Sequence, residues 1–112
     1  MLTLAHVTFD CSDAAALAGF WAQALRRPVD PGANEHFATI GADEHGLTLM
    51  FLKVDEDKAV KNRGHLDLTA DDREAEVKRL VGLGAAFQSE HDEHGHHWIV
   101  LQDPSGNEFC VA

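Results

Sequence analysis

Two histidines open two strand-like segments of the 112-residue chain, and they are the residues best placed to do chemistry. His6 lies in LAHVTFD and His65 lies in HLDLT, where apolar and polar residues alternate. Because successive strand residues point to opposite faces, each histidine shares a face with acidic or hydroxyl side chains and not with the apolar ones. Imidazole and carboxylate groups on one face can bind a metal ion, move a proton or hydrogen-bond a small molecule.

A third segment, at the end of the chain, divides its residues in the same way. There Phe109 and Val111 alternate with Glu108 and Cys110. The polar face of the three segments therefore carries His6, Thr8, Asp10, His65, Asp67, Glu108 and Cys110. A solvated face of an antiparallel sheet is the simpler explanation for any one of these positions. Two histidines at equivalent positions favour a site when the set is taken together.

The elements that must position these residues recur in one order along the chain. A strand over 2–10 precedes a helix that Ser12 or Asp13 can cap, and the apolar helical spacing includes Leu17, Phe20 and Trp21. Strands are predicted at 36–40 and 47–54, and residues 29–34 form a loop or a short edge strand. The second copy has a strand over 65–69, a helix capped by Asp71 or Asp72, and strands at 87–90, 97–102 and 107–111. The order β-α-β-β-β, met twice, predicts an α+β fold with both helices on one side of a mixed sheet.

The charged segment DEDKAVKNRG, residues 55–64, separates the two copies. We therefore predict one domain over 1–112, with module one at about 1–54, a charged linker at about 55–64 and module two at about 65–112. The length suits a single hydrophobic core.

Composition limits the partners. The net charge is −10, so nucleic acid and anionic membrane surfaces are poor partners. No apolar run is long enough to span a bilayer, and no signal peptide is evident, which favours a cytoplasmic protein. The two cysteines, Cys11 and Cys110, are too few for a disulfide scaffold and are expected to be reduced. Cys110 could act as a nucleophile only if His6 or His65 served as its base.

Four further histidines cluster in SEHDEHGHHWIV, at positions 91, 94, 96 and 97. Closely spaced histidine and acidic residues can chelate zinc or nickel, although Gly95 and the mixed acids also suit an ordinary solvated hairpin turn. The exposed surface is the expected place for His36 and His45. Trp98 is predicted to line a binding surface, and Met50 and Phe51 are predicted to make one end of it apolar.

Several of these segments carry a family resemblance. LAHVTFD with the capped helix around Phe20 and Trp21, KNRGHLDL, and the ending DPSGNEF resemble the vicinal oxygen chelate superfamily. This group includes glyoxalases, bleomycin-resistance proteins and extradiol dioxygenases, and the chain looks like a small glyoxalase-like domain protein. The resemblance implies two βαβββ modules that form a curved sheet whose concave face makes a cup.

The resemblance also implies positions for metal ligands. Metal-dependent members place ligands on the first and last strand of each module, which puts His6 and His65 at the first and third ligand positions. The second position falls in LTLMFL, residues 47–52, where no side chain suits a hard metal, and the fourth is Cys110 where a glutamate is usual. His6, His65 and Cys110 could hold Zn(II), whereas Ni(II) or Fe(II) would favour oxygen and imidazole ligands. Glu108, two residues from Cys110, could replace it only if the strand slid or bulged.

Two functions follow from this pattern. The first is a module that binds a small, partly aromatic molecule in the cup without the full family metal site. The expected contacts are His6, Asp10, Met50, Phe51, His65, Asp67, Trp98, Glu108 and Cys110. The alternative is a metal-dependent lyase, isomerase or dioxygenase-type enzyme. The resemblance also implies a homodimer, since members of this fold commonly dimerise.

Overall fold

A computed structural model describes residues 1–44 and 46–112, so the prediction for His45 lies outside the described residues. The chain forms two compact units, Met1–Asp57 and Lys58–Ala112. The point of division falls inside the charged segment 55–64. Among the described residues, each unit contains one helix and one mixed sheet, so the α+β class predicted from the repeated element order is confirmed.

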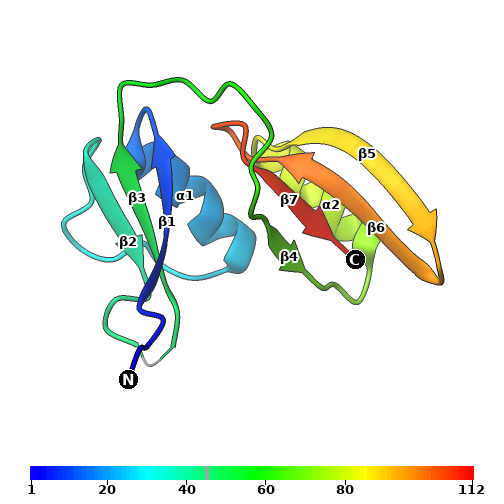
Figure 1. Ribbon diagram of the computed structural model, residues 1–112, viewed down its shortest axis with the longest axis horizontal. Helices are drawn as coiled ribbons and strands as arrows, with labels where there is room; N and C mark the ends of the chain where they lie inside the picture. The colour runs from blue at the N-terminus through cyan, green and yellow to red at the C-terminus, as the bar shows by residue number, and fades with distance from the viewer. Residues whose placement is uncertain (45) are drawn as a thin grey trace. The chain divides into compact units, whose positions relative to one another are not determined.

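The first unit contains β1 (His6–Cys11), α1 (Ala14–Leu25), β2 (Phe37–Ile40) and β3 (Thr48–Lys53). Its sheet has the order β1-β3-β2, with β1 parallel and β2 antiparallel to β3 (Figure 1). Residues 29–34 form a loop, so this sheet has one strand fewer than the sheet of the second unit.

Residues at both ends of helix α1 fix where it begins and ends. The Asp13 side chain accepts a hydrogen bond from the backbone N–H of Ala16 at 3.1 Å, and Arg26 closes the helix in a left-handed conformation with φ 54°. Its predicted apolar face is confirmed, because Leu17, Phe20 and Trp21 are buried. These side chains belong to the core of this unit.

The second unit contains β4 (Leu66–Leu68), α2 (Arg73–Leu83), β5 (Ala86–Glu93), β6 (His96–Gln102) and β7 (Glu108–Val111). Its sheet has the order β4-β7-β6-β5, in which β4 runs parallel to β7 and the other pairs are antiparallel. Helix α2 lies behind this sheet in Figure 1. Strand β5 is longer than predicted, because the β5–β6 turn occupies only His94 and Gly95, both with positive φ.

The turn before β7 is held by one carboxylate. Asp103 is buried, and its Oδ1 accepts hydrogen bonds from the backbone N–H groups of Ser105 and Asn107 at 2.9 and 3.0 Å. Gly106 takes φ 86°, a conformation that favours glycine. The turn predicted from DPSGN therefore forms, and it delivers Glu108 and Cys110 to one face of the sheet.

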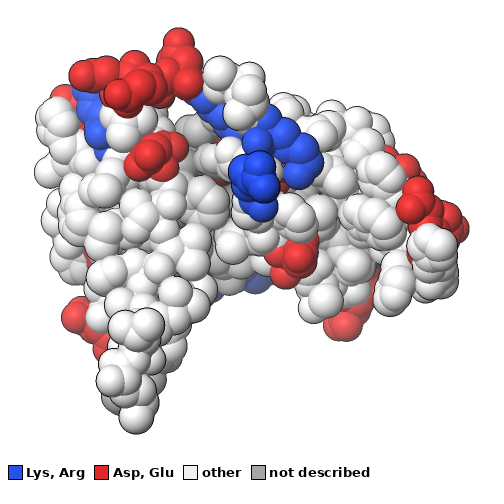
Figure 2. All heavy atoms as spheres, viewed as in Figure 1, with Lys and Arg blue, Asp and Glu red and all other residues white. Residues whose placement is uncertain are grey.

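Charge is distributed unevenly over the surface. Figure 2 shows acidic side chains over the loop that follows β3, where residues 55–57 are exposed, and at the tip of the β5–β6 hairpin. Neither helix of the described chain has the length and apolar character needed to cross a bilayer.

Candidate functional site

The sheet of the second unit has one apolar and one polar face, as the alternation predicts. Ile99, Leu101, Phe109 and Val111 are buried, and the pairing of β6 with β7 places them on one face of the sheet. The opposite face follows from the strand register: Asp67 lies beside Cys110, Cys110 beside Val100, and His91 beside Trp98. The side chains predicted to do chemistry in this unit therefore share the face that α2 leaves uncovered.

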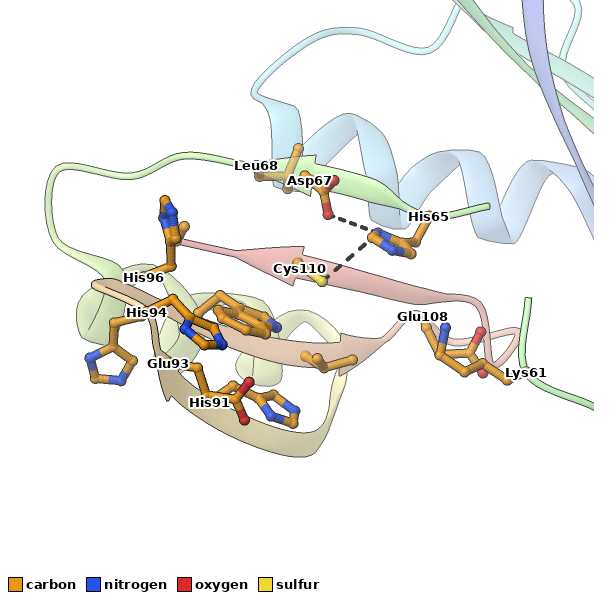
Figure 3. A pocket seen from close by; sticks show the side chains of 14 residues that line it. Lys61, His65, Asp67, Leu68, His91, Glu93, His94, His96, Glu108 and Cys110 are labelled. Carbon is orange, nitrogen blue, oxygen red and sulfur yellow. Dashed lines mark hydrogen bonds and ion pairs between the residues drawn. The ribbon is translucent and has the colours of Figure 1, made fainter. Parts of the chain in front are cut away.

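A groove of about 580 Å³ runs over this face, within the second unit. One end is formed by Lys61, His65, Asp67, Glu108 and Cys110, and the other by residues of the β5–β6 hairpin with Trp98 (Figure 3). Val100 and Leu68 lie along it and supply apolar surface. The groove thus joins a polar end with several titratable groups to an aromatic end.

Three potential ligands converge at the polar end. The Nδ1 atom of His65 lies 2.7 Å from Oδ1 of Asp67 and 3.9 Å from Sγ of Cys110. One ligand atom from each residue lies within 4.8 Å of the other two. Figure 3 shows the three side chains pointing toward one another from β7 and from the strand segment that contains β4.

The same geometry argues against Cys110 as a nucleophile. Burial, and then the hydrogen bond and negative charge of Asp67, raise the pKa of the Cys110 thiol to about 11. His65 faces both Asp67 and Cys110 with one ring nitrogen, Nδ1. When the Nδ1–H donates to the Asp67 carboxylate, that nitrogen has no lone pair to take a proton from the thiol. The thiol is therefore protonated at neutral pH.

Glu108 was predicted to contact a ligand, but its carboxylate is used within the protein. It is only 5% exposed, and it accepts hydrogen bonds from the Lys58 ammonium at 2.8 Å and from the backbone N–H of Asn62 at 2.9 Å. Burial raises the pKa of Glu108, but the Lys58 ammonium and the Asn62 N–H outweigh it and hold the pKa below its ordinary value. These hydrogen bonds from Lys58 and Asn62 to Glu108 therefore hold segment 58–62 against the start of β7.

Sequence reasoning missed this fastening because its partners lie about half the chain apart in sequence. Asn62 also donates from Nδ2 to Oδ1 of Asn107 at 2.8 Å, which adds a second attachment. The same segment places Lys61 at the groove. No local pattern in DEDKAVKNRG marks Lys58 or Asn62 as different from the other polar residues.

At the aromatic end, the His91 ring stacks on Trp98, with centroids 5.0 Å apart and planes 17° apart. Nε2 of His91 also lies 2.8 Å from the Ser89 hydroxyl. Trp98 lines the groove, where it was predicted to line a binding surface. The stacked pair presents a planar, polarizable wall of the kind that aromatic ligands contact.

A second titratable cluster lies outside the groove's polar end and joins Glu74, Glu90 and His97. Arg73 donates to Nδ1 of His97 at 2.9 Å, so the ring proton must be on Nε2, where it faces Glu90 at 2.6 Å. A metal ion needs a free lone pair on a ring nitrogen. The lone pair of Nδ1 accepts the hydrogen bond from Arg73 and Nε2 carries the proton, so neither nitrogen of His97 can bind an ion in this arrangement. We interpret the cluster as an attachment between α2 and the hairpin.

In the first unit, His6 and Asp10 are exposed on β1, on the face predicted from the alternation. Met50 is half-buried on β3. The prediction for Phe51 is wrong: this side chain is fully buried and stacks on Phe9 at 6.2 Å, so it offers no surface to a ligand. Neighbouring strand residues point to opposite faces, so Met50 and Phe51 cannot both line one surface.

The family described as glyoxalase-like domain matches residues 6–112. The chain belongs to the glyoxalase-like domain family. It shares the fold of the vicinal oxygen chelate superfamily, as the resemblance implied, and a search of curated protein sequences finds no significant match.

Solved structures of similar fold cover nearly the whole chain. A glyoxalase/bleomycin resistance/dioxygenase family enzyme from Burkholderia phytofirmans is 19% identical, with a TM-score of 0.73 over 95% of this chain and 94% of that one. A fosfomycin resistance protein from Listeria monocytogenes, solved with Mn(II) and a dihydroxypropylphosphonic acid, is 14% identical, with a TM-score of 0.77 over 99% and 89%. A lactoylglutathione lyase from Agrobacterium tumefaciens is 15% identical, with a TM-score of 0.66 over 99% and 92%. At these identities the likeness concerns the fold.

The metal site implied by the family can be tested against this glyoxalase-like chain. In the first unit only His6 offers a ligand at the implied positions, because residues 47–52 contain none. In the second unit Cys110 stands at the fourth position, and the nearby carboxylate of Glu108 is paired with Lys58. The residues present do not fit a four-ligand site built from oxygen and imidazole donors.

Proposed function

We propose that this glyoxalase-like protein binds a small, partly aromatic molecule in the groove of its second module. The observation that carries the proposal is the groove itself, which joins the stacked pair of His91 and Trp98 to the polar end at His65, Asp67 and Cys110. Its volume of about 580 Å³ lies in the usual range for small-molecule sites.

The two ends of the groove offer different contacts to a ligand. Trp98 and His91 supply a flat wall on which a ring can stack, and such contacts typically contribute about 0.5–1.5 kcal/mol beyond the area that they bury. The polar end supplies acceptors at Asp67, a thiol donor at Cys110 and a cation at Lys61. A ligand with a ring at one end and a hydrogen-bonding or anionic group at the other matches both.

Fluorescence can test this proposal because the chain has two tryptophans and only one lines the groove. Trp21 is fully buried in the first unit, so quenching by a planar probe such as quinoline-2-carboxylate would report on Trp98. We expect saturable quenching, and a loss of about tenfold in affinity for His91→Ala, which removes the stacked partner. His36→Ala, an exposed histidine of the first unit, is the matched control.

Quenching that does not saturate, or that is unchanged by His91→Ala, would count against the groove as the binding site. The proposal supposes that the small molecule binds without the metal site implied by the family. It fails in this form if isothermal titration finds tight metal binding that requires both His6 and His65. That outcome would favour the alternative, a metal-dependent lyase, isomerase or dioxygenase-type enzyme. The alternative in turn fails if untagged protein carries no metal and His6→Ala behaves as wild type in every assay.

Self-association is a separate part of the proposed function. We also propose that the chain forms a homodimer, as the resemblance implies, and that it is located in the cytoplasm, as the sequence predicts. Sedimentation equilibrium of the full chain tests the first: a strict monomer at all concentrations removes it.

A further inference from the structure

We propose that His65, Asp67 and Cys110 form a metal site of their own, contained in the second module and selective for Zn(II)-like ions. This goes beyond the small-molecule binding proposed above. It also differs from the metal site implied by the family, because it uses Asp67 as a ligand and does not use His6.

The register of the sheet brings the three donors together. Strands β4 and β7 are parallel neighbours, and Asp67 is the direct partner of Cys110. His65 lies two residues before Asp67, on the same side of the strand segment, so its ring reaches over the same pair of residues. Backbone pairing therefore holds two of the three donors in place before any ion binds.

The donor distances are close to those that a tetrahedral ion needs. With Zn–N near 2.0 Å and Zn–S near 2.3 Å, nitrogen and sulfur ligands lie about 3.6 Å apart, and nitrogen and oxygen ligands about 3.3 Å apart. The observed separations are 3.9 Å between His65 Nδ1 and Cys110 Sγ, and 2.7 Å between His65 Nδ1 and Asp67 Oδ1. The first separation must shorten by about 0.3 Å and the second must lengthen by about 0.6 Å, changes that side-chain rotation can supply.

Two charged groups near the site could affect ion binding, the Glu108 carboxylate and the Lys61 ammonium. Glu108, the nearest other carboxylate on β7, is occupied by Lys58 and Asn62, so it does not compete for the ion. Lys61 is the one lysine or arginine among the described residues that line the groove, and its charge acts on Cys110. A cation beside the site weakens ion binding without blocking it, because the Lys61 side chain is exposed and solvent screens its charge.

The ligand set selects the class of ion. Ion binding releases the Cys110 thiol proton to solvent and leaves the His65 ring proton on Nε2, so the ion meets a thiolate, the Nδ1 lone pair and a carboxylate. A thiolate and an imidazole favour Zn(II) and Co(II), whereas Mg(II), Ca(II) and Mn(II) prefer sites made of oxygen ligands. Three protein ligands leave a coordination position open, as in zinc sites that bind a further molecule. That position lies at the polar end of the groove.

Co(II) titration of the full, untagged chain tests the site, because a cobalt–thiolate bond gives a charge-transfer band in the near ultraviolet. We expect this band to grow to one equivalent in the wild type. It should be absent in Cys110→Ser and weakened by about tenfold or more in affinity in Asp67→Asn, while Zn(II) but not Mn(II) displaces the cobalt. Circular dichroism shows that each variant is folded.

Two controls locate the site. His6→Ala should leave the titration unchanged, and a loss of binding in that variant would overturn the proposal in favour of ligands from both modules. His94→Ala combined with His96→Ala should also have no effect, because those residues belong to the hairpin tip; dependence on them would likewise overturn it. Lys61→Gln should tighten binding by about threefold, since it removes the neighbouring positive charge. Absence of the band at millimolar cobalt would refute the site outright.

Discussion

Loss of the ion pair between Lys58 and Glu108 should destabilise the second unit measurably. Glu108 is 5% exposed and the Lys58 side chain is 23% exposed, so removal of the lysine leaves a largely buried carboxylate with one remaining partner from segment 58–62, the N–H of Asn62. Breaking a fully buried pair costs about 3–5 kcal/mol, and a partly hydrated one costs less. We therefore expect Lys58→Met to lower the free energy of unfolding by about 2 kcal/mol at pH 7.

The effect should depend on pH in a definite direction. The pKa of Glu108 is lower in the folded protein than in the unfolded chain, so its stabilising contribution is present above the unfolded pKa and is lost as the pH falls through the folded value. Once Glu108 is protonated it carries no charge, so loss of the Lys58 ammonium no longer leaves an unpaired buried charge. The destabilisation caused by Lys58→Met should therefore shrink in acid.

Urea denaturation, followed by tryptophan fluorescence at pH 7 and again in acid, measures both effects. Lys61→Met is the matched control, because Lys61 is an exposed lysine of the same segment whose described hydrogen bond is a long one of 3.4 Å to the carbonyl of Asn62. The control should change the unfolding free energy by less than about 0.5 kcal/mol. Equal effects of the two substitutions, or a Lys58→Met effect that grows in acid, would refute the reasoning.

Two further predictions concern a core side chain and the groove thiol. Phe51→Ala should lower the free energy of unfolding by about 3–5 kcal/mol in urea denaturation, as a large buried aromatic does; a loss below about 1 kcal/mol would contradict its place in the core. Iodoacetamide should alkylate Cys110 in the native protein at pH 8 about 100 times more slowly than in urea, because a pKa raised from 9.0 to about 11 leaves little thiolate, and Asp67→Asn should speed the native reaction. The raised pKa of Cys110 also affects folding, because the folded protein holds the thiol proton more tightly than the unfolded chain does. The stability that this gives is fully present below the unfolded pKa and is lost as the pH rises through about 11. Native and unfolded rates within tenfold of each other, by peptide mass spectrometry, would contradict the shift.

The sequence determined much of the architecture because its signals were local. Alternation over residues 6–10 and 108–111 predicted which side chains share a face. The sequence offered Ser12 or Asp13 and Asp71 or Asp72 as helix caps, and the structure uses Asp13 and Asp72. The DPSGN turn forms as expected, since its geometry depends on residues within four positions of Asp103. The same face pattern brought His65, Asp67 and Cys110 into one set before their distances were known.

Only the tertiary structure decided which of these residues remain available. Glu108 carries the same alternation signal as Cys110, yet it is paired with Lys58, fifty positions away in sequence, while Cys110 stays in the groove. Phe51 was expected at the surface, but the packing of β3 under α1 buries it. Local pattern fixes the face on which a side chain lies, whereas its partners depend on segments that meet only in the folded chain, and those partners decide its chemistry.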